Sequence, residues 1–151
     1  MSIEAKLKEL DIVLEKGSTS DLPFIPVIQT GNLVFTSGQV CRRDEELLFT
    51  GKVGEHVSIE DGQQAAKQCI VNCLSVLQED LGSLDRIKRV VKVLGFVQSA
   101  DNFKEQPTVI NAASELLLSI FGEKGKHARS AIGVNGLPGD TPVEIEVIVE
   151  I

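Results

Sequence analysis

The chain has 151 residues, 42% of them hydrophobic, and a net charge of −7 at pH 7 with histidine neutral. This composition is typical of a soluble globular protein, and the length suffices for a substantial core. The acidic balance argues against a nucleic-acid partner, because such a surface repels phosphate backbones. No segment reaches the roughly 18 apolar residues of a membrane span, and the N-terminus lacks a secretory signal, so we expect a cytoplasmic protein with no membrane partner.

The residues that could bind a metal are few. The cysteines are Cys41, Cys69 and Cys73, an odd number without the spacing of a disulfide framework, which favours a reducing compartment. The two histidines, His56 and His127, form no ligand pattern with these cysteines. We therefore expect buried structural thiols and no metal site.

The first elements are short. Residues 2–10 predict a helix with Ser2 as its N-cap. Residues 18–27 contain two prolines and predict a loop. Residues 31–40, GNLVFTSGQV, predict one strand, in which Gly38 marks a bulge or a close approach of the backbone to another group.

A polar, glycine-containing connection with a short hairpin is expected over residues 41–57. Ser58 then begins a long helix as its N-cap, and Gly82 ends it. Apolar residues recur at three- and four-residue steps, which places them on one face of the helix. They are Ala66, Cys69, Ile70, Cys73, Leu74, Leu77 and Leu81.

The second half alternates strands with one helix. Residues 87–99 predict a long strand, and the basic run over 86–92 alternates with apolar residues, which favours the polar side of a strand over a nucleic-acid footprint. A second amphipathic helix is expected over about 107–121.

Two further strands end the chain. Residues 127–134, HARSAIGV, predict a strand that contains Arg129, although arginine is seldom buried. Every second residue from 143 to 151 is apolar, and Glu144, Glu146 and Glu150 lie between these positions, which predicts a half-buried strand with the three glutamates on one face.

This order of elements predicts an α+β fold. Two amphipathic helices can cover only one face of a small sheet, and the chain has no further element for the other face. A symmetric oligomer is the natural cover for that face.

Four segments, GNLVFTSGQV, INAASELLLSIFG, HARSAIGV and LPGDTPVEIEV, resemble the RidA/YjgF family, also labelled endoribonuclease L-PSP or translation initiation inhibitor. The resemblance covers about residues 24–150. An extra N-terminal helix and a longer middle section resemble its long-chain subgroup, which implies a single domain over 1–151 with a helical extension over about 1–17. The family also implies a chorismate-mutase-like fold, with a mixed sheet and two main helices packed on one face, assembled as a homotrimer with sites at the subunit interfaces.

The resemblance implies an enamine/imine deaminase. Such proteins hydrolyse reactive 2-imino and 2-enamino acids to 2-keto acids and ammonia, with no cofactor and no metal. A first alternative is a non-catalytic protein that binds a keto acid or related carboxylate on the same scaffold. A second is the endoribonuclease or translation inhibitor of the older label, against which stand the acidic composition, the lack of tyrosine and tryptophan, and the presence of only two histidines.

Two charged residues match the family's reactive groups. Arg129 matches the arginine that binds the substrate carboxylate, and a planar guanidinium suits that task because it can grip a carboxylate through two parallel hydrogen bonds. Glu144 matches the catalytic carboxylate that positions water. The alternatives are a structural ion pair for Arg129 and a solvated row of glutamates for Glu144.

Several small and polar residues complete the implied substrate-binding pocket. Ser37 and Gly38 match its SGQ element, and Asn111 matches an asparagine of the second helix. The alternative for Ser37 and Asn111 is that they satisfy local backbone groups.

The chain departs from the family's prototype at three positions. Phe24 stands in place of the pocket tyrosine, Ala131 in place of a cysteine, and Gly133 in place of a larger acidic residue. Together with Ser130, the small residues at 131 and 133 predict room for a ligand beside Arg129.

Overall fold

A computed structural model of the chain describes residues 1–17 and 21–151. A mixed sheet forms one layer, with strand order β1-β2-β8-β6-β7, and β3 pairs with β8 beside β2. Among the strands that the described residues add to this sheet, β6 and β7 run parallel and the other pairs are antiparallel. The strands are β1 (Val27–Thr30), β2 (Leu33–Thr36), β3 (Gln39–Val40), β6 (Arg89–Gln98), β7 (Ala128–Val134) and β8 (Val143–Glu150).

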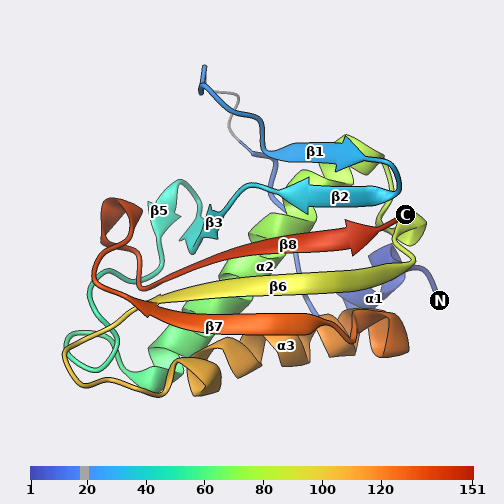
Figure 1. Cartoon of the computed structure of the whole chain (residues 1–151). Coiled ribbons are helices and arrows are strands. Elements are labelled where there is room, and N and C mark those ends of the chain that lie inside the picture. Colours follow the sequence, from blue (N-terminus) through green and yellow to red (C-terminus); the bar gives the residue numbers. More distant parts are fainter. Residues whose placement is uncertain (18–20) are drawn as a thin grey trace.

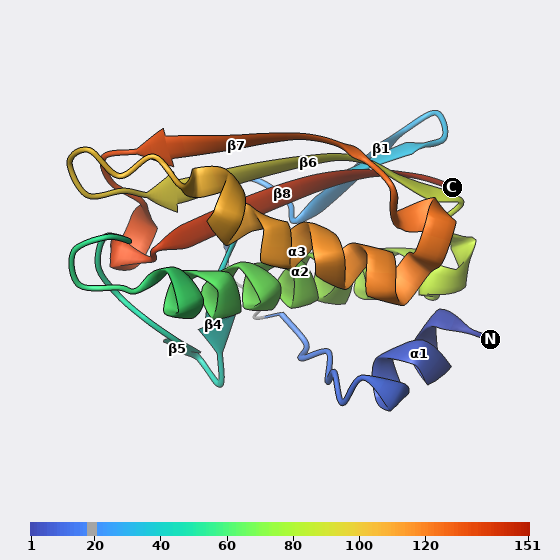
Figure 2. The same ribbon diagram turned by 90° about the horizontal axis from the view of Figure 1, so that it is seen from below.

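The helices lie on one side of this sheet. Helices α2 (Ile59–Leu81) and α3 (Gln106–Phe121) pack against one face, and no helix of residues 1–17 and 21–151 covers the opposite face, which we call the bare face (Figures 1 and 2). Helix α1 (Ile3–Glu9) lies beyond this helical layer, as does the hairpin of β4 (Arg42–Arg43) and β5 (Glu46–Leu47) (Figure 2). Single 3-10 turns occur at Leu84–Arg86, Gly122–Gly125 and Pro138–Asp140. The predicted α+β architecture with two helices on one face is confirmed.

The capping residues expected from the sequence are found at the helix ends. Ser2 Oγ accepts a hydrogen bond from the N–H of Ala5 at 3.1 Å, and Ser58 Oγ accepts one from Asp61 at 3.1 Å. Gly82 ends α2 with a φ of 80°, a conformation that other residues adopt at a cost. No helix of the described residues is both long enough and apolar enough to cross a membrane.

The strand predicted over 31–40 is wrong in one respect, because it is split into β2 and β3. Phe35 pairs with Ile148 and Gln39 pairs with Ile145, so four steps on one chain match three on the other. The extra residue is a bulge at positions 37 and 38, where the sequence placed it.

Strand β1 was not predicted. It begins at Val27, the last residue of the predicted loop, and it pairs with β2 around a turn at Gly31 (φ 60°). The segment 21–26 is free of helix and strand, as predicted, while residues 18–20 of that loop lie outside the described residues.

The side chains of β8 point alternately to the covered face of the sheet and to the bare one. Its buried residues alternate with half-buried ones, and Glu144, Glu146 and Glu150 all lie on the bare face, as predicted. The bare face also carries apolar side chains from the neighbouring strands, placed there by their pairing. They are Ile28, Phe35, Leu94, Phe96, Ile132 and Ile148.

The three cysteines lie in the core beneath the sheet, each at most 1% exposed. The thiols of Cys69 and Cys73 donate to the backbone carbonyls of Val143 and Ile145, each at 3.4 Å. Burial raises the pKa of Cys73 to about 12 and that of Cys69 well above its ordinary value. All three are free and buried, as predicted, and no metal-binding group of residues occurs within the described ranges.

Gly95 marks a close approach between the centre of the sheet and α3. A Cβ atom there would lie 2.7 Å from Cδ1 of buried Ile110. We expect Gly95→Ala to lower the free energy of unfolding by about 1–3 kcal/mol, because the added methyl overpacks the layer. Gly136→Ala is the control, since its Cβ meets no atom within 4 Å. Urea unfolding measures both, and equal midpoints would contradict the tight packing.

Candidate functional site

Arg129 lies on β7, the edge strand of the sheet, and its side chain reaches α3. Its Nη1 donates to Asn111 Oδ1 at 2.8 Å and to Ser114 Oγ at 3.2 Å. The register explains this direction, because Arg129 pairs with Val93, whose buried side chain faces the helices. A charged residue in a core-like strand is thus accommodated at the rim, where two polar groups of α3 accept its hydrogen bonds.

The hydrogen bonds beyond Ser114 have a defined direction. His127 Nδ1 lies 2.6 Å from the carbonyl oxygen of Gly125, which only accepts, so Nδ1 carries the hydrogen. In the neutral ring Nε2 then accepts from the hydroxyl of Ser114, at 2.9 Å. Ser114 uses its proton on His127 and a lone pair on Arg129. The chain of bonds fixes one half of the guanidinium.

The other half of the guanidinium is free. Neither Nε nor Nη2 of Arg129 has a hydrogen-bond partner among the described residues. The ion pairs among the described residues are Lys6–Glu9 and Lys126–Glu123. Arg129 is in neither of them, so the alternative of a structural ion pair for Arg129 finds no partner within those residues. An unpaired edge of a guanidinium is the group that binds a carboxylate through two bonds.

Glu144 lies on the bare face of the sheet, where it pairs with Val40 on one side and Phe96 on the other. Burial of its half-covered carboxylate raises the pKa of Glu144, and the nearby charge of Glu146 raises it further. A raised pKa makes a carboxylate a stronger base than an ordinary one, which favours a group that accepts a proton and returns it.

The bulge brings Gly38 against this carboxylate. A Cβ at position 38 would lie 3.0 Å from Cδ and Oε1 of Glu144, so glycine is what admits the carboxylate. Ser37 donates its hydroxyl proton to the carbonyl of Ile25 at 2.6 Å, which is the local backbone role considered for it. This bond holds the segment that carries Phe24, whose ring is 57% exposed.

Within one chain, Arg129 and Glu144 lie on opposite faces of the sheet. Their partners on β6, Val93 and Phe96, are three residues apart, and side chains one or three residues apart point to opposite faces. Two strand spacings and three residue steps put their Cα atoms about 14 Å apart. The chain therefore carries two half-sites, one around Arg129 and one around Glu144.

The comparisons with known proteins agree with this fold. The sequence model of a family described as endoribonuclease L-PSP matches residues 18–151. The chain belongs to this family, which is also the RidA/YjgF family.

Relatives of the chain match most of its length. Protein TCP17 of Trypanosoma cruzi is 39% identical over 150 residues, 99% of this chain and 94% of that protein. A 2-iminobutanoate/2-iminopropanoate deaminase of Dermatophagoides farinae is 32% identical over 132 residues, 85% of this chain and 86% of that one. A solved protein of unknown function from Agrobacterium tumefaciens is 42% identical with a TM-score of 0.92, and the match covers 99% and 92% of the two chains.

Two of the small residues beside Arg129 have a packing role in this RidA/YjgF protein. The predicted room at Gly133 is wrong, because a Cβ there would lie 2.5 Å from Nε2 of Gln106, which bonds Ser99 and fills the space. Ala131 pairs with Gly95 and packs against the core on the helical side. The small side chains at these two positions therefore allow α3 to pack close to β7.

Ser114 and His127 were not predicted as site residues. His127 is three residues before Ser130 in HARSAIGV, and Ser114 is three residues after Asn111, which is one helical turn. That spacing placed Ser114 beside Asn111, but only the position of β7 over α3 shows that both meet Arg129.

The raised pKa of Glu144 generates a first prediction for the site. In the folded chain this group binds a proton over the range between its ordinary pKa and its raised value, so stability falls as pH rises through that range. We expect Glu146→Gln to lower the pKa of Glu144, while burial keeps it above the ordinary value. Carboxyl ¹³C NMR titration measures the change. Glu150→Gln is the control, and an equal shift from both substitutions would contradict the assignment to Glu146.

The direction of the bonds around His127 generates a second prediction. We expect the neutral ring to carry its hydrogen on Nδ1, because the carbonyl of Gly125 can only accept. Long-range ¹H–¹⁵N NMR distinguishes the two ring nitrogens, and His56, whose ring has no hydrogen bond within the described ranges, is the internal reference. A neutral His127 with hydrogen on Nε2 would show that Ser114 does not donate to it.

Proposed function

We propose that the protein hydrolyses small 2-imino acids to 2-keto acids and ammonia, with Arg129 holding the substrate carboxylate. The observation that carries this proposal is the free edge of the guanidinium. Asn111 and Ser114 occupy only Nη1, so Nε and Nη2 can bind the two oxygens of a carboxylate side by side. Deaminase relatives at about one-third identity support the same reaction class.

Glu144 supplies the proton transfers in this proposal. Its carboxylate takes a proton from water as the oxygen bonds to the imine carbon, and the π electrons of the C=N bond move to nitrogen. Glu144 returns that proton to nitrogen, which gives a carbinolamine. The hydroxyl proton of this intermediate then passes through Glu144 to nitrogen, the O–H electron pair forms the C=O bond of the keto acid, and the C–N bond breaks to release ammonia. The raised pKa of Glu144 supports this role, because a base and acid in turn works best with a pKa near the working pH. No cofactor or metal enters any of these steps.

A complete site in this proposal needs two chains. Arg129 and Glu144 of one chain lie on opposite faces of the sheet, so the guanidinium of one copy meets the carboxylate of another. The apolar residues on the bare face support its burial against further copies, and we propose the homotrimer of the family. Three free thiols fit the reducing cytoplasm as the compartment.

Five residues form or support the pocket in this assembly. Gly38 makes room for the Glu144 carboxylate, and Ser37 holds the segment whose exposed Phe24 ring forms an apolar wall. Asn111 fixes the guanidinium, and Ala131 keeps β7 close to α3. The substrate side chain that meets Phe24 is small and apolar.

A non-catalytic carboxylate-binding protein is the second candidate. Phe24 favours it, because the phenyl ring brings no hydroxyl to a reaction that moves protons. Calorimetry with 2-ketobutyrate separates the two functions, since this candidate expects tight binding and no acceleration of imine hydrolysis.

The endoribonuclease label finds less support in the geometry. His56 lies in a loop that pairs with Ser99 past the end of β6, and His127 precedes the pair of Ala128 with Lys92 near its start. Seven strand residues separate these positions by about 23 Å, too far for the two rings to act as an acid–base pair within one chain. Ribonuclease activity that persists through repeated purification would favour this label instead.

The two-chain site generates a test that mixes variants. We expect Arg129→Ala and Glu144→Gln each to lower kcat/KM for imine hydrolysis by about a hundredfold or more. When the two variants are unfolded together and refolded, about a quarter of the interface sites receive both native residues, so activity returns to about a quarter of the native value. An amino-acid oxidase supplies the imine, and release of the keto acid is followed.

Matched controls are Arg89→Ala and Glu150→Gln, which change the same residue types on the same sheet and are expected to keep the native rate. Light scattering is expected to give three times the chain mass of 16.3 kDa. A mixture that stays inactive although its chains exchange would mean that activity needs both native residues in the same chain, which contradicts the two-chain site.

A further inference from the structure

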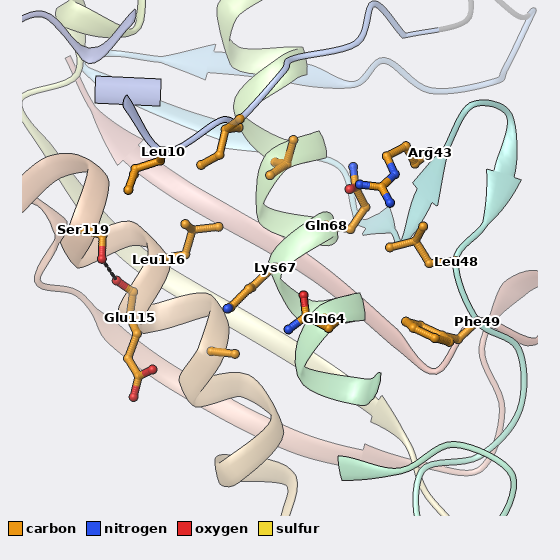
Figure 3. A pocket seen from close by; sticks show the side chains of 13 residues that line it. Leu10, Arg43, Leu48, Phe49, Gln64, Lys67, Gln68, Glu115, Leu116 and Ser119 are labelled. Atoms are coloured by element: carbon orange, nitrogen blue, oxygen red, sulfur yellow. Dashed lines mark hydrogen bonds between the residues drawn. The ribbon is translucent and has the colours of Figure 1, made fainter. Parts of the chain in front are cut away.

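A groove lies on the side of the helical layer that faces away from the sheet. It has a volume of about 630 Å³, within the range of small-molecule sites. Figure 3 shows its side chains, which come from α2, α3, the segment after α1 and the hairpin β4–β5. None of them belongs to the two half-sites. The lining residues are Leu10, Ile12, Arg43, Leu48, Phe49, Gln64, Lys67, Gln68, Val71, Ala112, Glu115, Leu116 and Ser119.

Hydrogen bonds hold the N-terminal wall of this groove in place. The N–H of Ile3 donates to Asp85 at 2.8 Å, and the N–H of Gly17 donates to Glu79 at 2.9 Å. Leu7 is 5% exposed and anchors α1 to the core. Glu15 then accepts from the N–H of Asp44 at 3.2 Å, which ties this wall to the hairpin. The groove is bounded on both sides by fixed segments.

The floor of the groove is apolar. Val71 of α2 and Ala112 of α3 are buried beneath it, and half-buried Leu116 lies beside them. Leu48 and Phe49 continue the apolar surface on the hairpin side. A ligand with a hydrocarbon body would remove this surface from water.

Unused hydrogen-bond donors border this floor. The side chains of Lys67, Arg43 and Gln64 have no hydrogen-bond partner among the described residues. Lys67 and Gln64 extend from the same side of α2 into the groove (Figure 3).

The charge of the groove is opposite to that of the chain. Arg43 and Lys67 are cations that take part in no ion pair within the described ranges, and Glu115 is the one carboxylate of the lining. Its carboxylate points away from Lys67 (Figure 3). The groove is therefore a positive site on a protein whose net charge is −7.

We propose that this groove binds a small amphipathic anion, a carboxylate with a hydrocarbon chain. The carboxylate lies against Lys67 and Gln64, and the chain lies over Val71, Ala112 and Leu116. Two unpaired cations select the negative head, and the apolar floor selects the tail, so neither a short anion nor a neutral alcohol satisfies both. This site is independent of the proposed imine hydrolysis.

Calorimetry on the full chain tests the proposal with four probes. Octanoate is expected to bind with a saturable, one-to-one isotherm, while acetate, octanol and octylamine bind more weakly or not at all. Lys67→Glu is expected to weaken octanoate roughly five- to tenfold, and Lys67→Met to weaken octanoate while leaving octanol unchanged. Lys104→Glu is the matched control, since it makes the same change of charge at an exposed loop residue outside the groove.

NMR shifts locate the bound octanoate and separate it from the carboxylate site. We expect the shifts to gather on Gln64, Lys67 and Leu116, and Arg129→Ala to leave octanoate affinity unchanged. Equal affinity for octanol, equal weakening by Lys104→Glu, loss of binding in Arg129→Ala, or shifts on the bare face of the sheet would each overturn the proposal. A failure of imine hydrolysis would leave the groove's result as it stands.

Discussion

The alternation of side chains between the two faces along β8 and, beyond an irregularity between Val90 and Lys92, along β6 is the constraint on which the rest of the molecule depends. Every second residue must be apolar, because one face of these central strands lies under two helices. The remaining residues are free to be polar, and on β8 three of them are glutamates. The same two-residue period that builds the core thus places the carboxylates where no helix covers them.

That period also decides what a single chain can do. Arg129 and Glu144 pair with residues of β6 whose side chains point to opposite faces of the sheet. No side-chain rotation therefore brings the two groups together through the sheet. Arg129 is instead held on the helical side of the rim by Asn111 and Ser114. A guanidinium at a rim and a carboxylate on a bare face are complementary only between copies, which makes assembly a requirement of the chemistry proposed here.

Much of this arrangement could be predicted from the sequence. The caps at Ser2, Ser58 and Gly82 are local, and they lie where the sequence indicated. The bare face followed from counting elements. Strand β1 was missed although Val27, Ile28 and Thr30 favour a strand, because it is only four residues long and follows the two prolines that indicated a loop.

The site was less predictable than the fold. The bonds of His127 and Ser114 to one another and to Arg129 depend on how β7 lies over α3, which no local pattern specifies. Gly133 was taken for ligand space because a small residue in a sequence does not reveal what fills its surroundings. Gln106, on a different element, occupies that volume.

The one-residue bulge at positions 37 and 38 changes which residues of the following segment face the helices, from the even-numbered to the odd-numbered ones. Before the bulge, Val34 and Thr36 face the helices, and after it the odd-numbered residues do, so Cys41 enters the core. Deleting a single residue there would turn the next segment over, exchanging inside for outside along β3 and the hairpin beyond. One inserted residue therefore decides which side chains face two surfaces. These are the surroundings of the Glu144 carboxylate on one side of the molecule and the hairpin wall of the groove on the other.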